Sequence, residues 1–251
     1  MSSLIVAAGV ATAYASGLLG AHRFNVFRMR RAAGGFPTLR WLDWDALLDG
    51  LLPSGPARAA QSPSPAEGGP SPRLLSQLPD DGAARHALLC ALVTGEKIEA
   101  SRFEPAGFSG GEAKWLSKLS RLRSQPEAVL DELEAEPEST AAGVYLREHL
   151  FLQRRIGLLN LELAVFASKR RLRGALERYS DAPALHFVRA AASAQMGFNS
   201  QVLDDLGRAV YFSKQSPFYL RAVVELPFVA EARPALHQQC RALLESKAAL
   251  G

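Results

Sequence analysis

PALHFVRAAASAQMGFNSQVLDDLGRAVYFS, residues 183–213, contains two helix patterns that are joined by a short turn. Asp181, followed two residues later by a proline, gives the start signal of the first helix, which is expected to end near Gly197. Asn199 or Ser200 caps the second helix. Apolar positions recur at helical spacing, and no alternating run is bounded by hairpin turns. The stretch therefore predicts a pair of helices within an all-α fold.

Start signals of the same kind recur on both sides of this pair. Ser109 with Glu112, and Ser124 with Glu127, have the spacing of capping boxes, in which each side chain bonds the backbone N–H of the other residue. Further helices are expected over residues 82–93, 112–122, 126–136, 140–171 and 234–249, and from Ser216 onward.

The longest expected helix, residues 140–171, contains the apolar run IGLLNLELAVFA, residues 156–167. This run includes Asn160 and Glu162, so it is too short and too polar to cross a bilayer. We expect it to be the central core helix of the domain.

The composition agrees with a helical protein that has a substantial core. The chain has 251 residues, of which 48% are apolar, and a formal net charge of +4. It is rich in Ala, Leu and Arg, which favour helices, and poor in Ile, Thr and aromatic residues, which favour strands. Cys90 and Cys240 lack a second Cys or His at ligand spacing. We expect two buried thiols in a reducing compartment.

The last third of the chain resembles the tetratricopeptide repeat family. The features that carry the resemblance are small residues in the first helix, a turn with glycine, and inward-facing residues in the second helix, namely Ala190, Ala191, Ala194, Gly197, Leu203, Leu206 and Ala209. Residues 216–244 look like the terminal segment that closes such arrays. The resemblance implies antiparallel helix hairpins that stack as a short α-solenoid or bundle.

Members of this family bind peptides or partner helices in a groove and carry out no chemistry themselves. The resemblance therefore implies a scaffold for protein–protein interaction. The candidate groove residues are Tyr145, Arg189, Gln195, Tyr211 and Tyr219.

Residues 3–20, SLIVAAGVATAYASGLLG, carry no charge. As a helix they would measure roughly 27 Å, close to the ~30 Å hydrocarbon core of a bilayer. The residues expected inside the membrane are Leu4, Ile5, Val6, Val10, Leu18 and Leu19. Because the positive charges follow the segment, we expect a single-pass anchor in the inner membrane with the body in the cytoplasm. The side chains expected at the lipid headgroups are Arg23, Arg28, Arg30 and Arg31.

Two other interpretations of this segment stay open. Ala, Gly and Ser are only weakly apolar, and a helix of this composition also suits a buried position or a site in a partner protein. A cleaved signal peptide is the third interpretation, although such peptides begin with basic residues that Met1-Ser2-Ser3 does not supply.

Changes in composition divide the chain. Residues 1–33 are the expected anchor, and residues 34–52 are an amphipathic helix that packs on the body or lies at the membrane surface. Residues 53–72, PSGPARAAQSPSPAEGGPSP, are nearly all Pro, Ser, Gly and Ala, which predicts a flexible linker. Residues 73–251 form the helical domain, with the repeat-like part at residues 183–251.

No group of residues has the spacing of an active site. The histidines form no pair at metal-ligand spacing with another His or Cys. Residues 107–114, GFSGGEAK, are Gly-rich but lack the Gly-Lys-Ser/Thr ending of a phosphate loop. The basic cluster at residues 169–171 lacks the aromatic side chains that stack on bases. The sequence therefore predicts no catalytic residue, metal, cofactor or small-molecule substrate, and it disfavours nucleic acid as a partner.

These observations together predict a non-enzymatic, membrane-anchored helical-repeat adaptor that presents a binding surface to protein partners. The alternative is a soluble structural subunit of a larger complex, whose N-terminal helix docks into a partner. An enzyme of an unrecognised all-α type is a third and less favoured possibility. The Ala-, Arg- and Pro-rich composition is typical of a bacterial genome of high GC content.

Overall fold

The described part of the chain is mostly helical. The structure, a computed structural model, describes residues 42–48, 87–89, 91–92, 98, 100–103, 106, 108–135, 140–155, 161–197 and 199–249. No strand occurs within these ranges, so the predicted all-α class is confirmed. The expected anchor, residues 1–33, and the expected linker, residues 53–72, lie outside them.

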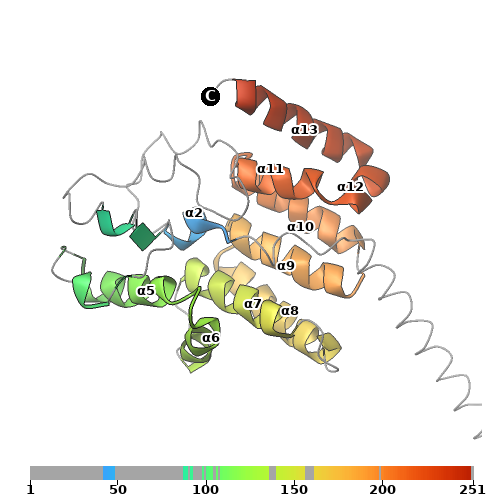
Figure 1. Cartoon of the computed structure of the whole chain (residues 1–251). Coiled ribbons are helices and arrows are strands. Elements are labelled where there is room, and N and C mark those ends of the chain that lie inside the picture. The colour runs from blue at the N-terminus through green and yellow to red at the C-terminus, as the bar shows by residue number, and fades with distance from the viewer. Residues whose placement is uncertain are drawn as a thin grey trace, which may run out of the picture.

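The longer helices follow one another along the second half of the chain. They are α5 (Gly110–Ser120), α6 (Pro126–Ala135), α7 (Ala141–Arg155), α8 (Leu161–Arg178), α9 (Pro183–Gln195), α10 (Asn199–Phe212), α11 (Pro217–Val224), α12 (Pro227–Ala232) and α13 (Pro234–Ala249). Before them come α2 (Trp44–Leu47) and the 3-10 helix η3 (Ala100–Arg102). From α7 to α13 the helices stack in chain order, from the yellow end of the molecule to the red one (Figure 1).

Two helix starts have side-chain caps where the sequence suggests them, whereas the N-cap of α9 is Ala182 without a side-chain hydrogen bond, so Asp181 does not cap that helix. Ser109 Oγ accepts the N–H of Glu112 at 3.3 Å, and Glu112 Oε2 accepts the N–H of Ser109 at 2.7 Å, which forms the predicted capping box. Thr140 Oγ1 accepts the N–H of Gly143 at 3.1 Å, at the start of α7. Prolines open α9, α11 and α12, where the missing N–H costs no helical hydrogen bond.

The single long helix predicted over residues 140–171 is wrong. The chain forms two helices there, α7 and α8, which pack against each other. In one straight helix Glu148 and Arg171 would lie roughly 35 Å apart. Arg171 Nε instead lies 2.6 Å from Glu148 Oε1, because the chain folds back between the two helices. Gly157 and Asn160, which stand between them in the sequence, are both weak helix formers.

α9 is the central helix, in place of the run at residues 156–167 that we expected there. Every residue between the first and the last of α9 is buried, with Arg189 as the partial exception. A helix that is apolar on all sides is buried on all sides. By contrast, α8, which holds the second half of the expected core run, leaves Leu163 and Phe166 exposed.

α9 divides the apolar core into two clusters. The first cluster joins α2 and α5 to α8 with one side of α9. The second joins the other side of α9 with α10 to α13, and the α9 residues in it are Phe187, Ala190, Ala191 and Ala194. Because alanine is small, α9 and α10 can pack closely. The α10 residues that we expected to face inward are all buried, namely Leu203, Leu206 and Ala209.

Gly197 makes the turn between α9 and α10. Its φ of 74° lies in the left-handed region, where glycine alone carries no steric penalty from a side chain. Its N–H bonds the carbonyl oxygen of Ala194 at 3.1 Å. The glycine of the predicted turn is therefore required by the backbone conformation there.

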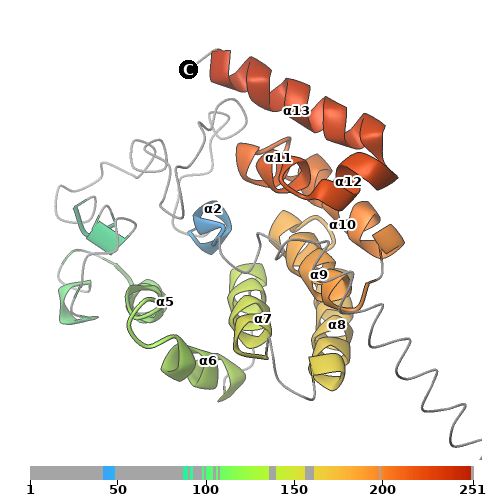
Figure 2. The same cartoon turned by 45° about the vertical axis from the view of Figure 1, so that its right-hand side comes forward.

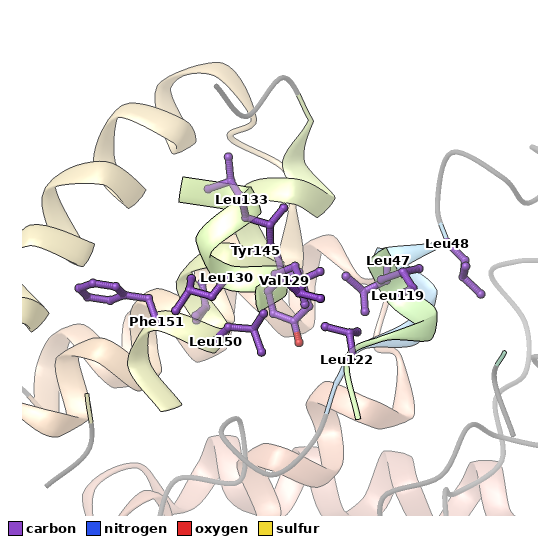
Figure 3. Close-up of a cluster of buried hydrophobic side chains, with 14 of the residues drawn as sticks. Leu47, Leu48, Leu119, Leu122, Val129, Leu130, Leu133, Tyr145, Leu150 and Phe151 are labelled. Atoms are coloured by element: carbon purple, nitrogen blue, oxygen red, sulfur yellow. The ribbon is translucent and has the colours of Figure 1, made fainter. Parts of the chain in front are cut away.

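The short helix α2 packs on the body of the protein. Figure 2 shows it inside the curve that α5, α7, α9 and α11 form around it. Leu47 and Leu48 are buried in the first cluster, where Leu47 lies with Leu119 of α5 (Figure 3). Residues 34–52 were expected either to pack on the body or to lie at the membrane surface. The described part of this segment, residues 42–48, packs on the body.

Two leucines provide a matched test of this arrangement. Leu185 of α9 is fully buried, so Leu185→Ala should lower the free energy of unfolding by about 2–5 kcal/mol. Leu163→Ala removes the same atoms from an exposed position and should change it by less than about 0.5 kcal/mol. Urea unfolding followed by circular dichroism measures both values. Equal losses for the two variants would contradict the central position of α9.

Candidate partner-binding surface

The five candidate groove residues do not share one surface. Tyr145 and Tyr219 are buried, Arg189 and Gln195 are half-buried, and Tyr211 is exposed. The fold therefore brings the first two into its interior and leaves Tyr211 at the outside of α10.

Tyr145 of α7 and Tyr219 of α11 both bind Asp43, which is buried and caps α2. The Asp43 N–H donates to Tyr145 Oη at 3.0 Å. Tyr219 Oη donates to Asp43 Oδ2, while Oδ1 accepts the N–H of Ala46 at 3.2 Å. A buried carboxylate is tolerated only when it is hydrogen-bonded, and these donors supply its bonds.

The environment of Tyr145 keeps its phenol neutral. Burial, and after it the negative charge of Asp43, hold the pKa of Tyr145 well above its ordinary value. A phenol with a raised pKa is poorly suited to proton transfer near neutral pH. Tyr145 therefore acts in this junction as a hydrogen-bonding group.

The other end of α2 is held by α5. Trp115 Nε1 donates to the carbonyl oxygen of Leu47 at 2.9 Å. Three side chains thus form hydrogen bonds with Asp43 or Leu47, namely Tyr145, Tyr219 and Trp115. We call these three residues the α2 site. They come from three different helices, α5, α7 and α11.

A buried ion pair joins α9 to α10. Arg189 Nε and Nη2 donate to the two carboxylate oxygens of Asp205 at 2.9 and 2.5 Å. His186 Nε2 donates to the carbonyl oxygen of Ser180 at 2.8 Å, and its Nδ1 lies 3.7 Å from Asp205 Oδ1. Burial alone would raise the pKa of Asp205, but His186 and Arg189 reverse that effect and lower it. The carboxylate is therefore charged at neutral pH.

Lys169 extends this junction to α8. Its Nζ donates to Gln201 Oε1 at 2.6 Å, which links α8 to α10. Burial lowers the pKa of Lys169, and the charge of Asp205 acts in the opposite direction. The polar groups of three consecutive helices thus meet in one place.

Glu148 forms a second buried junction, between α7 and α8. Arg171 Nε and Nη2 donate to its carboxylate at 2.6 and 2.9 Å, and Arg147 Nε donates at 3.1 Å. The Arg171 guanidinium also lies 4.5 Å from the ring centroid of Phe151. A carboxylate shared between two arginines in this way holds the two helices together.

Four buried polar side chains of the described residues have nitrogen or oxygen atoms with no hydrogen-bond partner. They are both ring nitrogens of His149 in α7, Oγ of Ser168 in α8, and Nδ1 of His186 and Oγ of Ser193 in α9. Burial lowers the pKa of His149 to about 4, so its ring is neutral at neutral pH. A buried polar group without a hydrogen bond lowers the stability of the fold. Helical periodicity in the sequence places these residues on helices but does not predict that their polar atoms lack partners.

Large apolar side chains are exposed on α8 and α10. Leu163 and Phe166 of α8 are 71% and 53% exposed, and Tyr211 of α10 is 76% exposed. Arg170 and Arg173 of α8 are also exposed, and within the described ranges neither has an ion-pair partner. We refer to these five exposed residues, four on α8 and one near the end of α10, as the α8–α10 surface. Figure 2 draws α2 on the left of α7 and α9, and α8 and α10 on the right of the molecule.

Two findings concern metal binding and thiol chemistry in the described residues. They contain no group of three or more His, Cys, Asp or Glu that could hold a metal ion. Cys240 is the expected buried free thiol, and burial raises its pKa to about 11, which makes it a poor nucleophile at neutral pH. Cys90 lies outside the described residues.

None of the described helices is both long and apolar enough to cross a membrane. The residues predicted to lie in the membrane and at its headgroups fall outside the described ranges, namely Leu4, Ile5, Val6, Val10, Leu18, Leu19, Arg23, Arg28, Arg30 and Arg31. Their role stays a prediction from the sequence.

No relative provides a template for these features, because no protein-family model, curated protein or solved structure gives a significant match to the chain. The function must therefore be argued from the residues themselves. The two features that bear on binding are the α8–α10 surface and the α2 site.

The burial of His149 predicts a pH dependence of stability. The unfolded chain takes up a proton at this histidine near pH 6.5, whereas the folded protein does so only near pH 4. The stability that depends on the neutral ring is therefore complete above about pH 6.5 and is lost as the pH falls toward 4. His149→Leu should reduce the loss of stability between about pH 7 and pH 5, measured by urea unfolding at both values. A loss as large as that of the wild type would contradict this origin.

Proposed function

We propose that the protein is a non-enzymatic, membrane-anchored helical-repeat adaptor that binds protein partners. The α8–α10 surface is the observation that carries this proposal. Three large side chains are exposed to water although contact with a partner would be more favourable for them, namely Leu163, Phe166 and Tyr211. Aromatic and Arg side chains are enriched at protein–protein interfaces. Arg170 and Arg173, on the same helix as Leu163 and Phe166, favour a partner with acidic groups.

The helix order supports a repeat architecture. α7 with α8, α9 with α10, and α11 with α13 pack as pairs of consecutive helices, with the short α12 between the last two. Such pairs are the units of a short α-solenoid, in which each unit buries its apolar side against its neighbours. In this proposal α8 and α10 are the outer helices of two neighbouring units.

The membrane attachment is proposed from the sequence. The uncharged residues 3–20 would supply the anchor, and the arginines that follow would meet anionic headgroups in the inner membrane, with the body in the cytoplasm. The linker at residues 53–72 would let an adaptor body reach partners at some distance from the bilayer.

Photo-crosslinking in the native cell tests the α8–α10 surface. A photoreactive phenylalanine analogue at Phe166 or Tyr211 changes shape little and should give discrete adducts of higher mass. The same analogue at Gln238, an exposed polar position on α13, is the matched control and should give none. Immunoblotting and mass spectrometry identify the adducts. Equal or absent adducts at all three positions would contradict a partner at this surface.

Fractionation tests the anchor. The full-length protein should stay with the membranes after a carbonate wash, because its first helix would lie in the hydrocarbon core. A version that starts at Thr38 should be recovered in the soluble fraction. If the wash releases the full-length protein as well, the first segment is a docking element for another protein. The chain would then be the soluble subunit of a larger complex.

A further inference from the structure

α2 is bound by side chains that are far from it in the sequence. Asp43 is 102 residues from Tyr145 and 176 residues from Tyr219. Trp115 is 68 residues from Leu47, whose carbonyl oxygen it binds. None of these bonds belongs to a hairpin of consecutive helices. The body thus holds α2 as a protein holds a separate helical peptide, with polar groups at its ends and apolar anchors between them.

Residues 42–48, LDWDALL, have the character of a short binding segment. Leu47 and Leu48 are completely buried and serve as anchors, and the buried Asp43 is the N-cap. The half-buried residues of the segment are Leu42, Trp44 and Ala46. Seven residues therefore place two large apolar side chains and one carboxylate in contact with the body.

Release of α2 would leave most of the core in place. The helix itself has four residues, and its apolar side chains join the first cluster alone. The second cluster, from α9 to α13, contains no residue of α2. Segments with few buried contacts open at a lower free energy than the whole fold.

The sequence between α2 and the body suits a tethered ligand. Residues 53–72 are predicted to be a flexible linker, and a segment on such a tether faces its site at an effective concentration on the order of millimolar. A helix from another protein must therefore compete with α2 at this effective concentration. The tether thus sets the affinity or concentration that a competing helix needs to occupy the site.

We propose that α2 is a displaceable intramolecular ligand, and that the α2 site binds a partner helix of the same chemistry. Such a helix carries Asp at its N-cap and two adjacent leucines at the fourth and fifth positions after it. The Asp accepts the Tyr219 hydroxyl, the leucines enter the first cluster, and Trp115 binds a carbonyl of the last turn. α2 keeps the site closed until such a helix replaces it. This site is separate from the α8–α10 surface and does not depend on the function proposed for it.

A labelled peptide in competition with α2 tests the proposal in the full-length chain. The probe is the synthetic peptide of residues 38–52, TLRWLDWDALLDGLL, followed by fluorescence anisotropy in mild detergent. Asp43→Asn in the chain removes the charged acceptor of its own α2, so the labelled wild-type peptide should bind this variant roughly tenfold more tightly than it binds the wild-type chain. Equal affinity for both chains, or no binding to either up to about 1 mM, would overturn the proposal.

Tyrosine variants in the Asp43→Asn chain provide the matched controls. Tyr219→Phe removes the hydroxyl that binds the peptide carboxylate and should weaken binding of the labelled peptide roughly tenfold. Tyr211→Phe makes the same change on the exposed side of α10 and should leave the affinity unchanged. If both variants bind alike, the peptide occupies another surface and the assignment is wrong.

A cleavable linker keeps the test independent of any variant that fails to fold. A protease site inserted within residues 53–72 of the otherwise wild-type chain allows α2 to be detached after folding. Cleavage should increase binding of the labelled peptide, because the tether no longer maintains the local concentration of α2. A cleaved fragment that never exchanges would make α2 a fixed part of the core and overturn the proposal. Exchange of the fragment only within dimers would also overturn the proposal, because the site would then bind α2 of a second copy of the chain.

Discussion

The enclosure of α9 on both sides is the constraint on which the other contacts depend. A helix in this position offers its polar side chains little contact with water, so a charged side chain on it is stabilised by a partner inside the protein. For Arg189 that partner is Asp205, a carboxylate that is itself buried. Removing either residue would leave the other buried and unpaired, which costs more than the pair itself contributes. One ion pair thereby fixes the position of α10 along α9.

α9 separates two apolar clusters, and α2 connects them again. Tyr145 belongs to the first cluster and Tyr219 to the second, and Asp43 bonds both. A partner helix at the α2 site would therefore contact both clusters at once. In Figure 2, α2 lies on the left and α8 and α10 lie on the right, so the two proposed binding sites involve different helices.

Local patterns in the sequence explained the helices but not the contacts between them. The capping box of Ser109 and Glu112 forms within four residues, and such short-range signals are visible in a sequence. The break between α7 and α8 was missed because weak helix formers lower the helical preference without showing where the chain turns. Tyr145 and Tyr219 were selected for their chemistry, but their partner Asp43 was not found. Asp43 is separated from these tyrosines by 102 and 176 positions, and contacts over such separations produce no periodic pattern in the sequence.

The distance along the chain between Asp43 and Tyr219 also orders events during synthesis. A ribosome adds about 5–20 residues per second, so the 176 residues between them take roughly 10–35 seconds. During that interval the leucines of α2 have left the ribosome while their binding site is still incomplete. Contacts of such long range also form slowly once both partners exist. Because Asp43 cannot bond Tyr219 until α11 has been synthesised, chaperones and neighbouring chains can reach the leucines of α2 before its binding site is complete.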